Sequence, residues 1–587
     1  MAFQDFAILS ERRRNERKEK VRKRIILGVL SSILLVCVIG AATFVLVNKT
    51  DPDNNNNNNT HKKPPSTTTN AKVENYLKIV KTICNSVEYK TKCEGPLSKV
   101  VENDTKLAQP KELLRVSIKL AEQEINKAFN KTTSMKFESE MDKGAYEDCK
   151  QLMNDAREEI GFSISEVSKN DLKKLSTRTP ELNNWLSAVI SYHQTCIDGF
   201  PDGELKNELK NLLQDPQEFV SNSLAIVKEL SYVLSTIQPS TVRHLLSAKS
   251  DGFPTWIGVE DRRMLKAADD KPTPNVTVAK DSSGNFKTIS EALAAIPQTY
   301  TGRYVVYVKE GIYEELVTVT KKMQNLTIYG DGSQKSIITG SKNFADGVRT
   351  FQTASFVVLG DGFLGKAMGF RNTAGAEKHQ AVAARVQADR AMFVNCRFEG
   401  YQDTLYAQTH RQFYRSCVIA GTIDFIFGDA ASVFQNCIMQ LRKPMSNQQN
   451  IVTAQGRYQK QETTGFVLQK CEIKADNTLV PEKDKIKSYL GRPWKEYSRT
   501  IVMESEIGDI IHPDGWLPWA GDFALKTLYY AEFNNTGPGA STNARVNWVG
   551  HKLINKDEAA KFTVGSFLNG TWINGRGVPA QMGLYNQ

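Results

Sequence analysis

Two different periods of apolar residues divide the chain into a helical half and a strand-rich half. Between residues 72 and 237, apolar positions recur every three or four residues, which predicts amphipathic helices. The clearest run starts at Pro110, a residue favoured in the first turn of a helix. Four other runs share this period: 73–89, 145–167, 180–197 and 205–234. We therefore expect residues 72–237 to form an all-α domain, an antiparallel four-helix bundle.

From residue 274 onward, the pattern changes to short runs of β-branched and aromatic residues separated by Gly, Asp and Asn. Cys396, Cys417 and Cys437 then lie 21 and 20 residues apart, each inside a similar fragment. A fixed period near 20 predicts stacked coils, and no long amphipathic helices alternate with the strands. Residues 274–587 are therefore predicted to form an all-β domain, a right-handed parallel β-helix.

The first 71 residues predict entry into the secretory pathway through a membrane anchor. Nine lysines and arginines lie between Arg12 and Arg24, and 23 residues without a charge follow at 25–47. That length can cross a bilayer as a transmembrane or signal-anchor helix, and the basic flank predicts a cytoplasmic tail over residues 1–24. Residues 48–71 are rich in Asn, Lys, Pro and Thr and predict a disordered stalk.

The cysteines of the helical region predict disulfides, because everything downstream of the anchor enters an oxidising compartment. Cys84, Cys93, Cys149 and Cys196 allow three connectivities. The short loop favours Cys84–Cys93, which leaves Cys149–Cys196. The glycosylation motifs are compatible with the same compartment; they begin at Asn103, Asn130, Asn275 and Asn325.

The cysteines of the β region are expected to differ from one another. Cys417 and Cys437 occupy matching places on neighbouring coils, close enough for a bridge between them. Cys396 and Cys471 are expected to remain buried free thiols.

A polar linker over residues 238–273 separates the two regions. It contains Arg262, Arg263, Met264 and Leu265, and a dibasic pair between two dissimilar domains predicts proteolytic processing there. The formal net charge of +11 is compatible with a polyanionic partner or with a solvated basic surface, so it does not decide the function.

Two carboxylates on neighbouring coils are the strongest chemical signal. Asp403 and Asp424 each follow a repeat cysteine by seven residues, so stacked coils would bring them about 4.8 Å apart. Two such groups cannot both ionise freely, which provides one proton donor and one charged nucleophile. Turn capping and a calcium site are the alternatives, but the neutral amides of Gln380 and Gln402 suit an oxyanion better than a dication.

A second candidate site lies in the motif that runs from Leu490 to Lys495. Arg492 can clamp a carboxylate there, and Trp494 can stack on a sugar ring, although a salt bridge beside a core tryptophan would give the same pattern. The sequence contains no Gly-x-Ser-x-Gly, His-Glu-x-x-His or phosphate-loop motif, which disfavours a serine hydrolase.

At these residues the chain resembles the plant pectin methylesterases (pectinesterases) that carry an N-terminal pectinesterase-inhibitor-like pro-region. The matching stretches are Gly311-Ile-Tyr-Glu-Glu315, His379-Gln-Ala-Val382, Tyr401-Gln-Asp-Thr-Leu-Tyr406, Gly421-Thr-Ile-Asp-Phe-Ile-Phe-Gly428 and Leu490-Gly-Arg-Pro-Trp-Lys-Glu-Tyr-Ser-Arg499. Ala384 stands where this family is expected to have Leu. The helical region resembles the inhibitor family in its cysteine spacing and helical pattern.

The resemblance implies hydrolysis of the C6 methyl esters of cell-wall homogalacturonan, without a metal or another cofactor. It implies Asp424 as nucleophile, Asp403 as proton donor and base, and Gln402 as transition-state stabiliser. The implied substrate-binding residues are Thr350, Gln380, Arg492 and Trp494.

The resemblance also implies the partners and the location of the protein. The helical domain would act in cis as an inhibitor or folding aid until a processing protease cuts near Leu265, and separate inhibitor proteins could bind in trans. The membrane-anchored form would mature to a secreted cell-wall protein with no nucleic-acid partner. Two rival functions remain, a polysaccharide lyase or glycoside hydrolase on the same fold, and a binding or inhibitor module.

Overall fold

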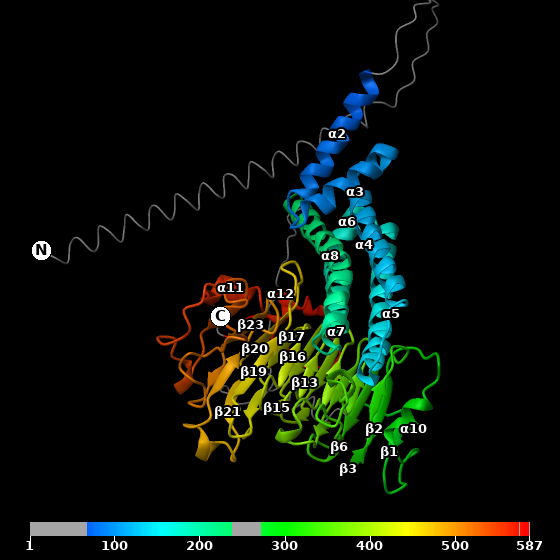
Figure 1. Ribbon diagram of the computed structural model, residues 1–587. Helices are drawn as coiled ribbons and strands as arrows, with labels where there is room; N and C mark the ends of the chain where they lie inside the picture. The colour runs from blue at the N-terminus through cyan, green and yellow to red at the C-terminus, as the bar shows by residue number, and fades with distance from the viewer. Residues whose placement is uncertain (1–66, 238–271, 575, 586–587) are drawn as a thin grey trace, which may run out of the picture.

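The structure is a computed structural model that describes residues 67–237, 272–574 and 576–585. In it, a tall helical domain stands on one flank of a β domain (Figure 1). The predicted tail (1–24), the predicted membrane segment (25–47) and Arg262, Arg263, Met264 and Leu265 of the linker lie outside the described residues. No helix in the described part of the chain is long and apolar enough to cross a membrane.

The helical domain is built mainly from four long helices that pack side by side, α4, α5, α7 and α8. The helices of this domain are α2 (Thr67–Cys84), α3 (Lys90–Asn103), α4 (Pro110–Thr132), α5 (Glu140–Lys169), α6 (Leu172–Thr177), α7 (Thr179–Asp198) and α8 (Glu204–Ile237). Pro110 occupies the first turn of α4, as its position in the sequence predicts. The apolar stripes of the helices meet in one buried cluster, which stabilises the domain.

Both predicted disulfides of this domain are present. Cys84–Cys93 ties α2 to α3, and Cys149–Cys196 joins α5 to α7 with its Cα atoms 4.5 Å apart. Because Cys149 lies near the start of α5 and Cys196 near the end of α7, the two helices run antiparallel.

The β domain consists of three parallel sheets stacked as a β-helix. The first sheet contains β1 (Val276–Val278), β2 (Tyr304–Val308), β5 (Leu326–Gly330), β8 (Leu364–Lys366), β11 (Ala391–Val394), β14 (Arg411–Arg415), β17 (Ala431–Gln435), β20 (Gly465–Gln469), β23 (Arg499–Met503), β25 (Tyr529–Phe533) and β26 (His551–Leu553). The second contains β3 (Gly311–Glu314), β6 (Ser336–Gly340), β9 (Gly369–Asn372), β12 (Arg397–Glu399), β15 (Val418–Gly421), β18 (Ile438–Leu441), β21 (Glu472–Ala475) and β24 (Glu506–Ile507). The third contains β4 (Val317–Val319), β7 (Phe356–Val358), β10 (Ala384–Val386), β13 (Leu405–Ala407), β16 (Ile426–Gly428), β19 (Asn450–Gln455) and β22 (Ser488–Gly491).

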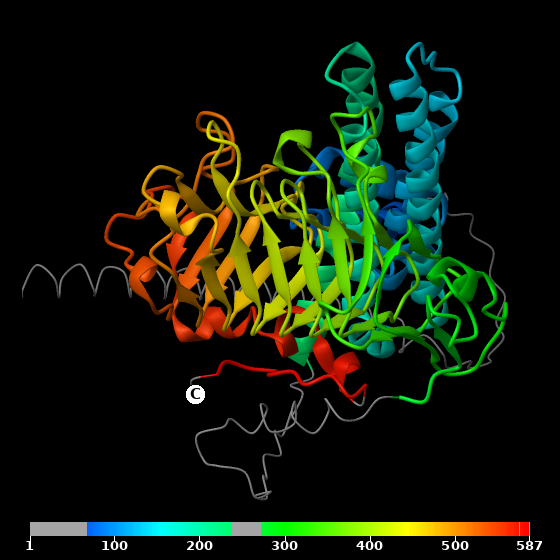
Figure 2. The same cartoon turned by 90° about the horizontal axis from the view of Figure 1, so that it is seen from below.

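Short helices and the C-terminal segment complete the β domain. The helices are α10 (Ile289–Ala294), α11 (Lys556–Ala560) and α12 (Val564–Phe567). Figure 2 shows the coils side by side along the domain, with the C-terminal segment in red running back along one side. Val564, Leu568 and Ile573 of that segment bury their side chains against the outer face of the first sheet.

The repeat seen in the sequence is the coil of the β-helix. Phe393, Tyr414 and Phe434 pair in register on β11, β14 and β17, and their rings stack with centroids 5.2 Å and 4.6 Å apart. The residue before each repeat cysteine turns the chain from the first sheet to the second with a positive φ, such as 53° at Asn395 and 54° at Asn436. Asparagine tolerates this left-handed conformation better than most residues, which explains its recurrence.

The predicted Cys417–Cys437 bridge is wrong for this structure. Cys396, Cys417, Cys437 and Cys471 are all buried free thiols. The Sγ of Cys417 donates to the carbonyl of Phe393 at 3.4 Å, and the Sγ of Cys437 makes the equivalent contact one coil further on at 3.5 Å. Because each corner repeats the same geometry, the thiols point the same way instead of toward each other.

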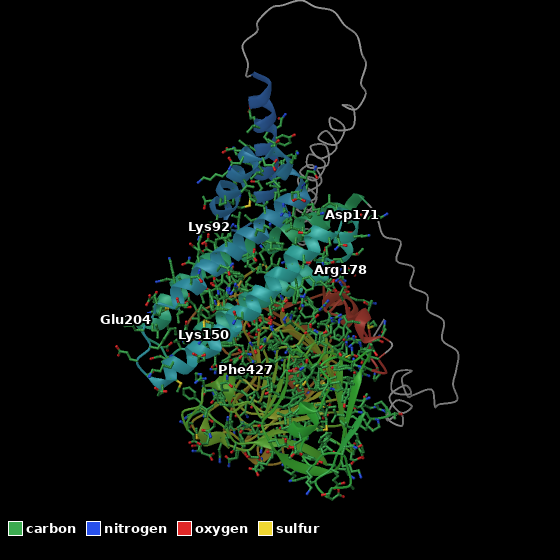
Figure 3. The ribbon with its side chains drawn as sticks, turned by 90° about the vertical axis from the view of Figure 1, so that its right-hand side faces the viewer. Lys92, Lys150, Asp171, Arg178, Glu204 and Phe427 are labelled. Carbon is green, nitrogen blue, oxygen red and sulfur yellow. A yellow bond between two sulfur atoms is a disulfide. The ribbon has the colours of Figure 1, made fainter. Side chains whose placement is uncertain are left out.

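The helical domain packs on the third sheet of the β domain. Its buried apolar cluster continues into Phe351, Val382, Tyr406 and Phe427, which belong to the β domain. Figure 3 shows Phe427 in the β domain directly beneath the helices. The two domains therefore share a core across their contact.

Candidate active site

The two predicted carboxylates lie at matching places on neighbouring coils. Leu405 of β13 pairs with Ile426 of β16, and Asp403 and Asp424 each lie two residues before those positions. The Asp403 N–H donates to the carbonyl of Ile423 at 3.0 Å. One ladder spacing, about 4.8 Å, therefore separates the two backbones, as the repeat predicts.

The backbone of both aspartates is left-handed, with φ of 64° at Asp403 and 51° at Asp424. The apolar neighbours Ile423 and Phe425 would suit a strand, but the chain turns at Asp424 from the second sheet to the third. This conformation costs a non-glycine residue about 1–3 kcal/mol and recurs at functional sites. The stacked corner holds both carboxylates at one edge of the third sheet.

Burial and charge separate the pKa values of the two carboxylates. Asp403 and Asp424 are only 8% and 5% exposed. Burial raises the pKa of Asp424, and the Arg492 guanidinium offsets part of that rise. Burial and then the charge of Asp424 raise the pKa of Asp403 well above its ordinary range, against a smaller opposing effect of Arg492. Asp403 is thus the group that retains a proton when Asp424 has lost its own.

Arg492 binds Asp424 in a two-point clamp. Its Nε lies 2.8 Å from Oδ1 and its Nη2 lies 2.6 Å from Oδ2. The guanidinium also lies over the ring of Trp519, 4.3 Å from the centroid. The sequence motif predicted Arg492 as a site residue. Trp519 was not predicted, because it lies in an irregular loop without a recognisable motif.

The two predicted amide donors stand side by side. Gln380 and Gln402 form a parallel bridge between neighbouring coils, and the Ala381 N–H donates to the Gln402 carbonyl at 3.2 Å. The Oε1 of Gln380 is buried without a hydrogen-bond partner. Gln402 directly precedes Asp403, so the backbones of both glutamines adjoin the corner that carries the carboxylates.

The two remaining predicted binding residues lie on either side of the carboxylates. Trp494 packs on Gly456, where an added Cβ would come within 2.8 Å of the indole ring, and meets Phe427 edge-on at 6.0 Å. Thr350 precedes β7, and the order of the third sheet places β10 between β7 and β13. Among the described residues, no group of three or more His, Cys, Asp and Glu side chains is placed to hold a metal ion.

The helical domain covers this part of the third sheet with α5 and α7. Along α7, the Ser191 hydroxyl donates to the carbonyl of Gln408 at 3.1 Å, and the Thr195 hydroxyl lies 3.2 Å from that of Tyr406. Along α5, Asp155 accepts a hydrogen bond from Gln387 at 2.7 Å. None of these contacts was predicted, because they join residues that lie far apart in the sequence.

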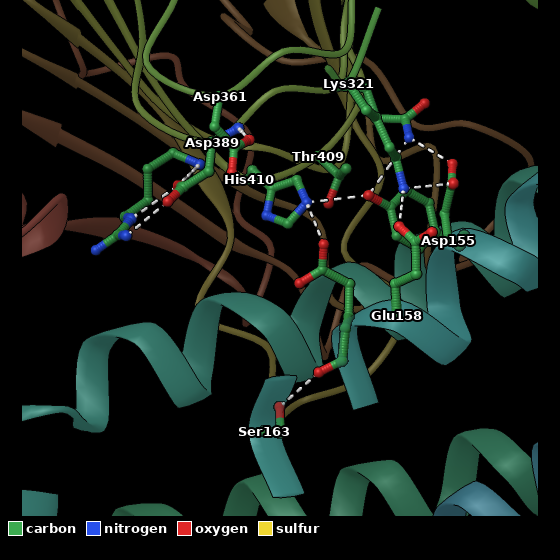
Figure 4. Close-up of polar contacts among 12 residues, drawn as sticks. Asp155, Glu158, Ser163, Lys321, Asp361, Asp389, Thr409 and His410 are labelled. Carbon is green, nitrogen blue, oxygen red and sulfur yellow. Dashed lines mark hydrogen bonds and ion pairs between the residues drawn. The ribbon is translucent and has the colours of Figure 1, made fainter. Parts of the chain in front are cut away.

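A buried histidine lies in the middle of this contact (Figure 4). His410 faces Glu159 of α5 at 3.4 Å and Tyr192 of α7 at 3.0 Å. Burial lowers the pKa of His410, but the carboxylates of Glu159, Asp389 and Asp361 together outweigh burial and raise it above its ordinary value. The carboxylate of Glu159 in the helical domain therefore contributes to the raised pKa of His410 while the two domains are in contact.

Known families match both regions of the chain. Residues 275–571 match the pectinesterase family, and residues 78–226 match the plant invertase/pectin methylesterase inhibitor family. Among curated relatives, pectinesterase/pectinesterase inhibitor 45 of Arabidopsis thaliana is 49% identical, and number 13 of the same plant is 50% identical. Each match covers 100% of both chains.

A solved structure supports the same grouping. Pectin methylesterase from carrot is 51% identical with a TM-score of 0.53, and the match covers 54% of this chain and 99% of the carrot chain. The chain belongs to the pectinesterase family and carries an N-terminal domain of the plant invertase/pectin methylesterase inhibitor family.

Proposed function

We propose that the chain hydrolyses the C6 methyl esters of homogalacturonan through Asp424 and Asp403. The observation that carries this proposal is the stacked pair itself, with Arg492 clamped on one carboxylate and the higher pKa on the other. Family membership and the carrot pectin methylesterase support the choice of substrate.

The first half of the reaction forms a covalent intermediate. The ionised carboxylate of Asp424 attacks the ester carbonyl carbon and gives a tetrahedral oxyanion, which the amides of Gln402 and Gln380 stabilise by donating hydrogen bonds. Asp403 then gives its proton to the departing methoxide, so methanol leaves and an anhydride joins C6 to Asp424.

The second half regenerates the enzyme. Asp403, now ionised, takes a proton from water, and the resulting hydroxide attacks the acyl carbon of the anhydride. The bond to Asp424 breaks and leaves the C6 carboxylic acid, which loses its proton to solvent, and both aspartates return to their first protonation states. Thr350, Arg492 and Trp494 hold the sugar units, Trp494 by stacking.

The helical domain is proposed to act as a pro-region in cis. We assign it the four-helix bundle of the inhibitor family, and we assign the catalytic domain (274–587) a right-handed coil. Because α5 and α7 cover the third sheet, the domain would inhibit the enzyme or assist its folding until a protease cuts at Arg262–Leu265. A membrane anchor over 25–47, release to the cell wall and inhibitor proteins in trans belong to the same proposal.

The test of the reaction class is an assay of residues 274–587 on methylated pectin. An esterase releases methanol and acid without creating new reducing ends. A lyase or glycoside hydrolase shortens the polymer, so a rise in reducing ends or unsaturated ends without methanol would overturn the proposal. A module that only binds would produce neither product.

A further inference from the structure

The ion pairs between the two domains share one polarity in the part of the chain that the structure describes. Within the described residues, each of them places the acid on the helical domain and the base on the β domain. The pairs are Asp148–Arg349, Asp155–Lys321, Glu158–Lys321, Glu159–His410, Glu181–Arg411 and Asp198–Lys495. The helical domain thus presents carboxylates to a basic surface that borders the catalytic aspartates.

Two of these carboxylates lie together at one end of the helical domain. Asp148 directly precedes Cys149 and Asp198 follows Cys196 by two residues, and the disulfide holds the two cysteines with Cα atoms 4.5 Å apart. Asp155, by contrast, lies seven residues further along α5, about 10 Å away at the rise of an α-helix. The disulfide therefore fixes Asp148 and Asp198 as a pair.

The bases that receive this pair adjoin the proposed sugar-binding residues. Arg349 precedes Thr350, and its Nε lies 2.7 Å from Asp148 Oδ2, while Gln352 donates to Oδ1 of the same carboxylate at 2.6 Å. Lys495 follows Trp494, and its Nζ lies 2.6 Å from Asp198 Oδ1. Among the described residues, no acid of the β domain forms an ion pair with Arg349 or Lys495.

The two bases also bracket the catalytic aspartates along the coil axis. Arg349 lies on the chain that leads into β7, and Lys495 lies on the chain that leaves β22. Asp403 and Asp424 precede β13 and β16, which the order of the third sheet places between β7 and β22. A polymer lying along this axis would pass both bases.

We propose that Arg349 and Lys495 bind the carboxylates of galacturonate units that are already de-esterified, on either side of the ester being hydrolysed. Asp148 and Asp198 of the helical domain occupy the same two positions in the uncut chain and stand in for those substrate carboxylates. This inference rests on the proposed function, because only a pectin substrate supplies carboxylates at regular intervals along a chain. The enzyme would then bind partly de-esterified pectin better than fully esterified pectin.

The same ion pairs would form if the domains only had complementary charges and Arg349 and Lys495 bound no substrate carboxylate. Lys321 distinguishes this explanation from the proposed binding sites. Lys321 also binds carboxylates of α5, but it lies two residues after the end of β4. Its partner Asp155 also accepts a hydrogen bond from Gln387, which follows the end of β10, and lies about 10 Å along α5 from Asp148. Lys321 is therefore at the edge of the third sheet opposite to Asp403 and Asp424, which precede their strands. Lys495 also follows its strand, but its Nζ reaches Asp198, which the disulfide holds beside Asp148. Lys321→Gln removes one interfacial charge away from the substrate path.

The test uses the 274–587 fragment, since the carrot chain consists almost entirely of the matching region and so shows that such a β domain folds alone. Arg349→Gln, Lys495→Gln and Lys321→Gln are compared in methanol release from highly esterified pectin and from the same pectin partly saponified. For the first two variants we expect KM on saponified pectin to rise roughly fivefold, the effect of one partly exposed charge pair, with kcat unchanged. On highly esterified pectin, KM and kcat should stay as in the parent fragment.

The other outcomes overturn the inference or the underlying function. An unchanged KM on saponified pectin, or an equal rise for Lys321→Gln, would show general electrostatics without subsites. Arg349→Lys should restore most of the low KM, and competition by saponified oligogalacturonide should weaken about fivefold in both Gln variants but not in Lys321→Gln. If the parent fragment releases no methanol from either pectin, the proposed function fails instead.

Discussion

Replacing Arg492 with Gln tests how the protein sets the charge of Asp424. The two hydrogen bonds of 2.8 Å and 2.6 Å disappear, and the carboxylate loses its only ion-pair partner among the described residues while remaining buried. An opposite charge at this distance lowers a carboxyl pKa by about 1–3 units. Since burial already raises the pKa of Asp424, removing Arg492 should raise it further by about that amount.

The sign of the effect on activity follows from the proposed role of Asp424 as the nucleophile. The nucleophile must be ionised, so activity falls as the pH drops through its pKa. In Arg492→Gln the acid limb of the kcat profile should move to higher pH by about 1–3 units, at a cost of about 1.4 kcal/mol per unit below the limb. The measurement is methanol release from pectin as a function of pH, with kcat and KM obtained separately.

Trp494→Phe is the matched control. It shortens the stacking surface beside Arg492 without changing any charge, so KM should rise while the acid limb stays in place. If Arg492→Gln changes KM alone and leaves the acid limb where it was, Arg492 only holds substrate, and the electrostatic reasoning is refuted.

Three further predictions concern the helical domain and its contact with the β domain. Glu159 of the helical domain helps to raise the pKa of His410, so the affinity between the two domains should be higher below that pKa and should fall as the pH rises through it. His410→Asn should therefore flatten the pH dependence of the affinity measured between separated domains. An unchanged pH profile in this variant would contradict the prediction. Asp148→Asn with Asp198→Asn in the full chain should increase methanol release severalfold over the uncut parent, and equal activity would show that neither carboxylate restrains the enzyme. Replacing both Cys149 and Cys196 by Ser removes a disulfide that closes a loop with a sequence separation of 47. The free energy of unfolding of the helical domain, measured in urea, should fall by about 4 kcal/mol, while that of the β domain should change little.

The stacking of the two aspartates could be predicted because a β-helix converts sequence spacing directly into distance. Once Cys396, Cys417 and Cys437 mark one coil each, any residues at equal offsets from them must stack. Asp403 and Asp424 each follow a repeat cysteine by seven residues, so their proximity could be predicted from sequence spacing alone. The helices followed in the same way from the spacing of their apolar residues.

Local conformation at the corners could not be predicted from these spacings. The left-handed φ at Asp424 and the parallel orientation of the thiols at Cys417 and Cys437 depend on how the chain turns between sheets. Helix α3 was also missed, because Gly95 and Pro96 within it are usually signs of a break. Periodicity describes the straight parts of a chain and carries little information about its bends.

The contacts between the domains carried no local signal at all. Asp148 is an ordinary polar position of α5 in the sequence, and its partner Arg349 lies 201 residues away. Complementary charges can be recognised as a pair only after both domains are folded and in contact.

The most direct test of the paired-carboxylate mechanism is a comparison of Asp424→Asn and Asp403→Asn in single-turnover methanol release, with circular dichroism to confirm that each variant is folded. Asp424→Asn has no nucleophile and should release no methanol above the uncatalysed background. Asp403→Asn keeps the nucleophile but has no proton to give, so its release should be slowed by about 100-fold to 10,000-fold and lose its dependence on the protonation of Asp403. Methanol release by a folded Asp424→Asn variant at the parent rate would contradict the account.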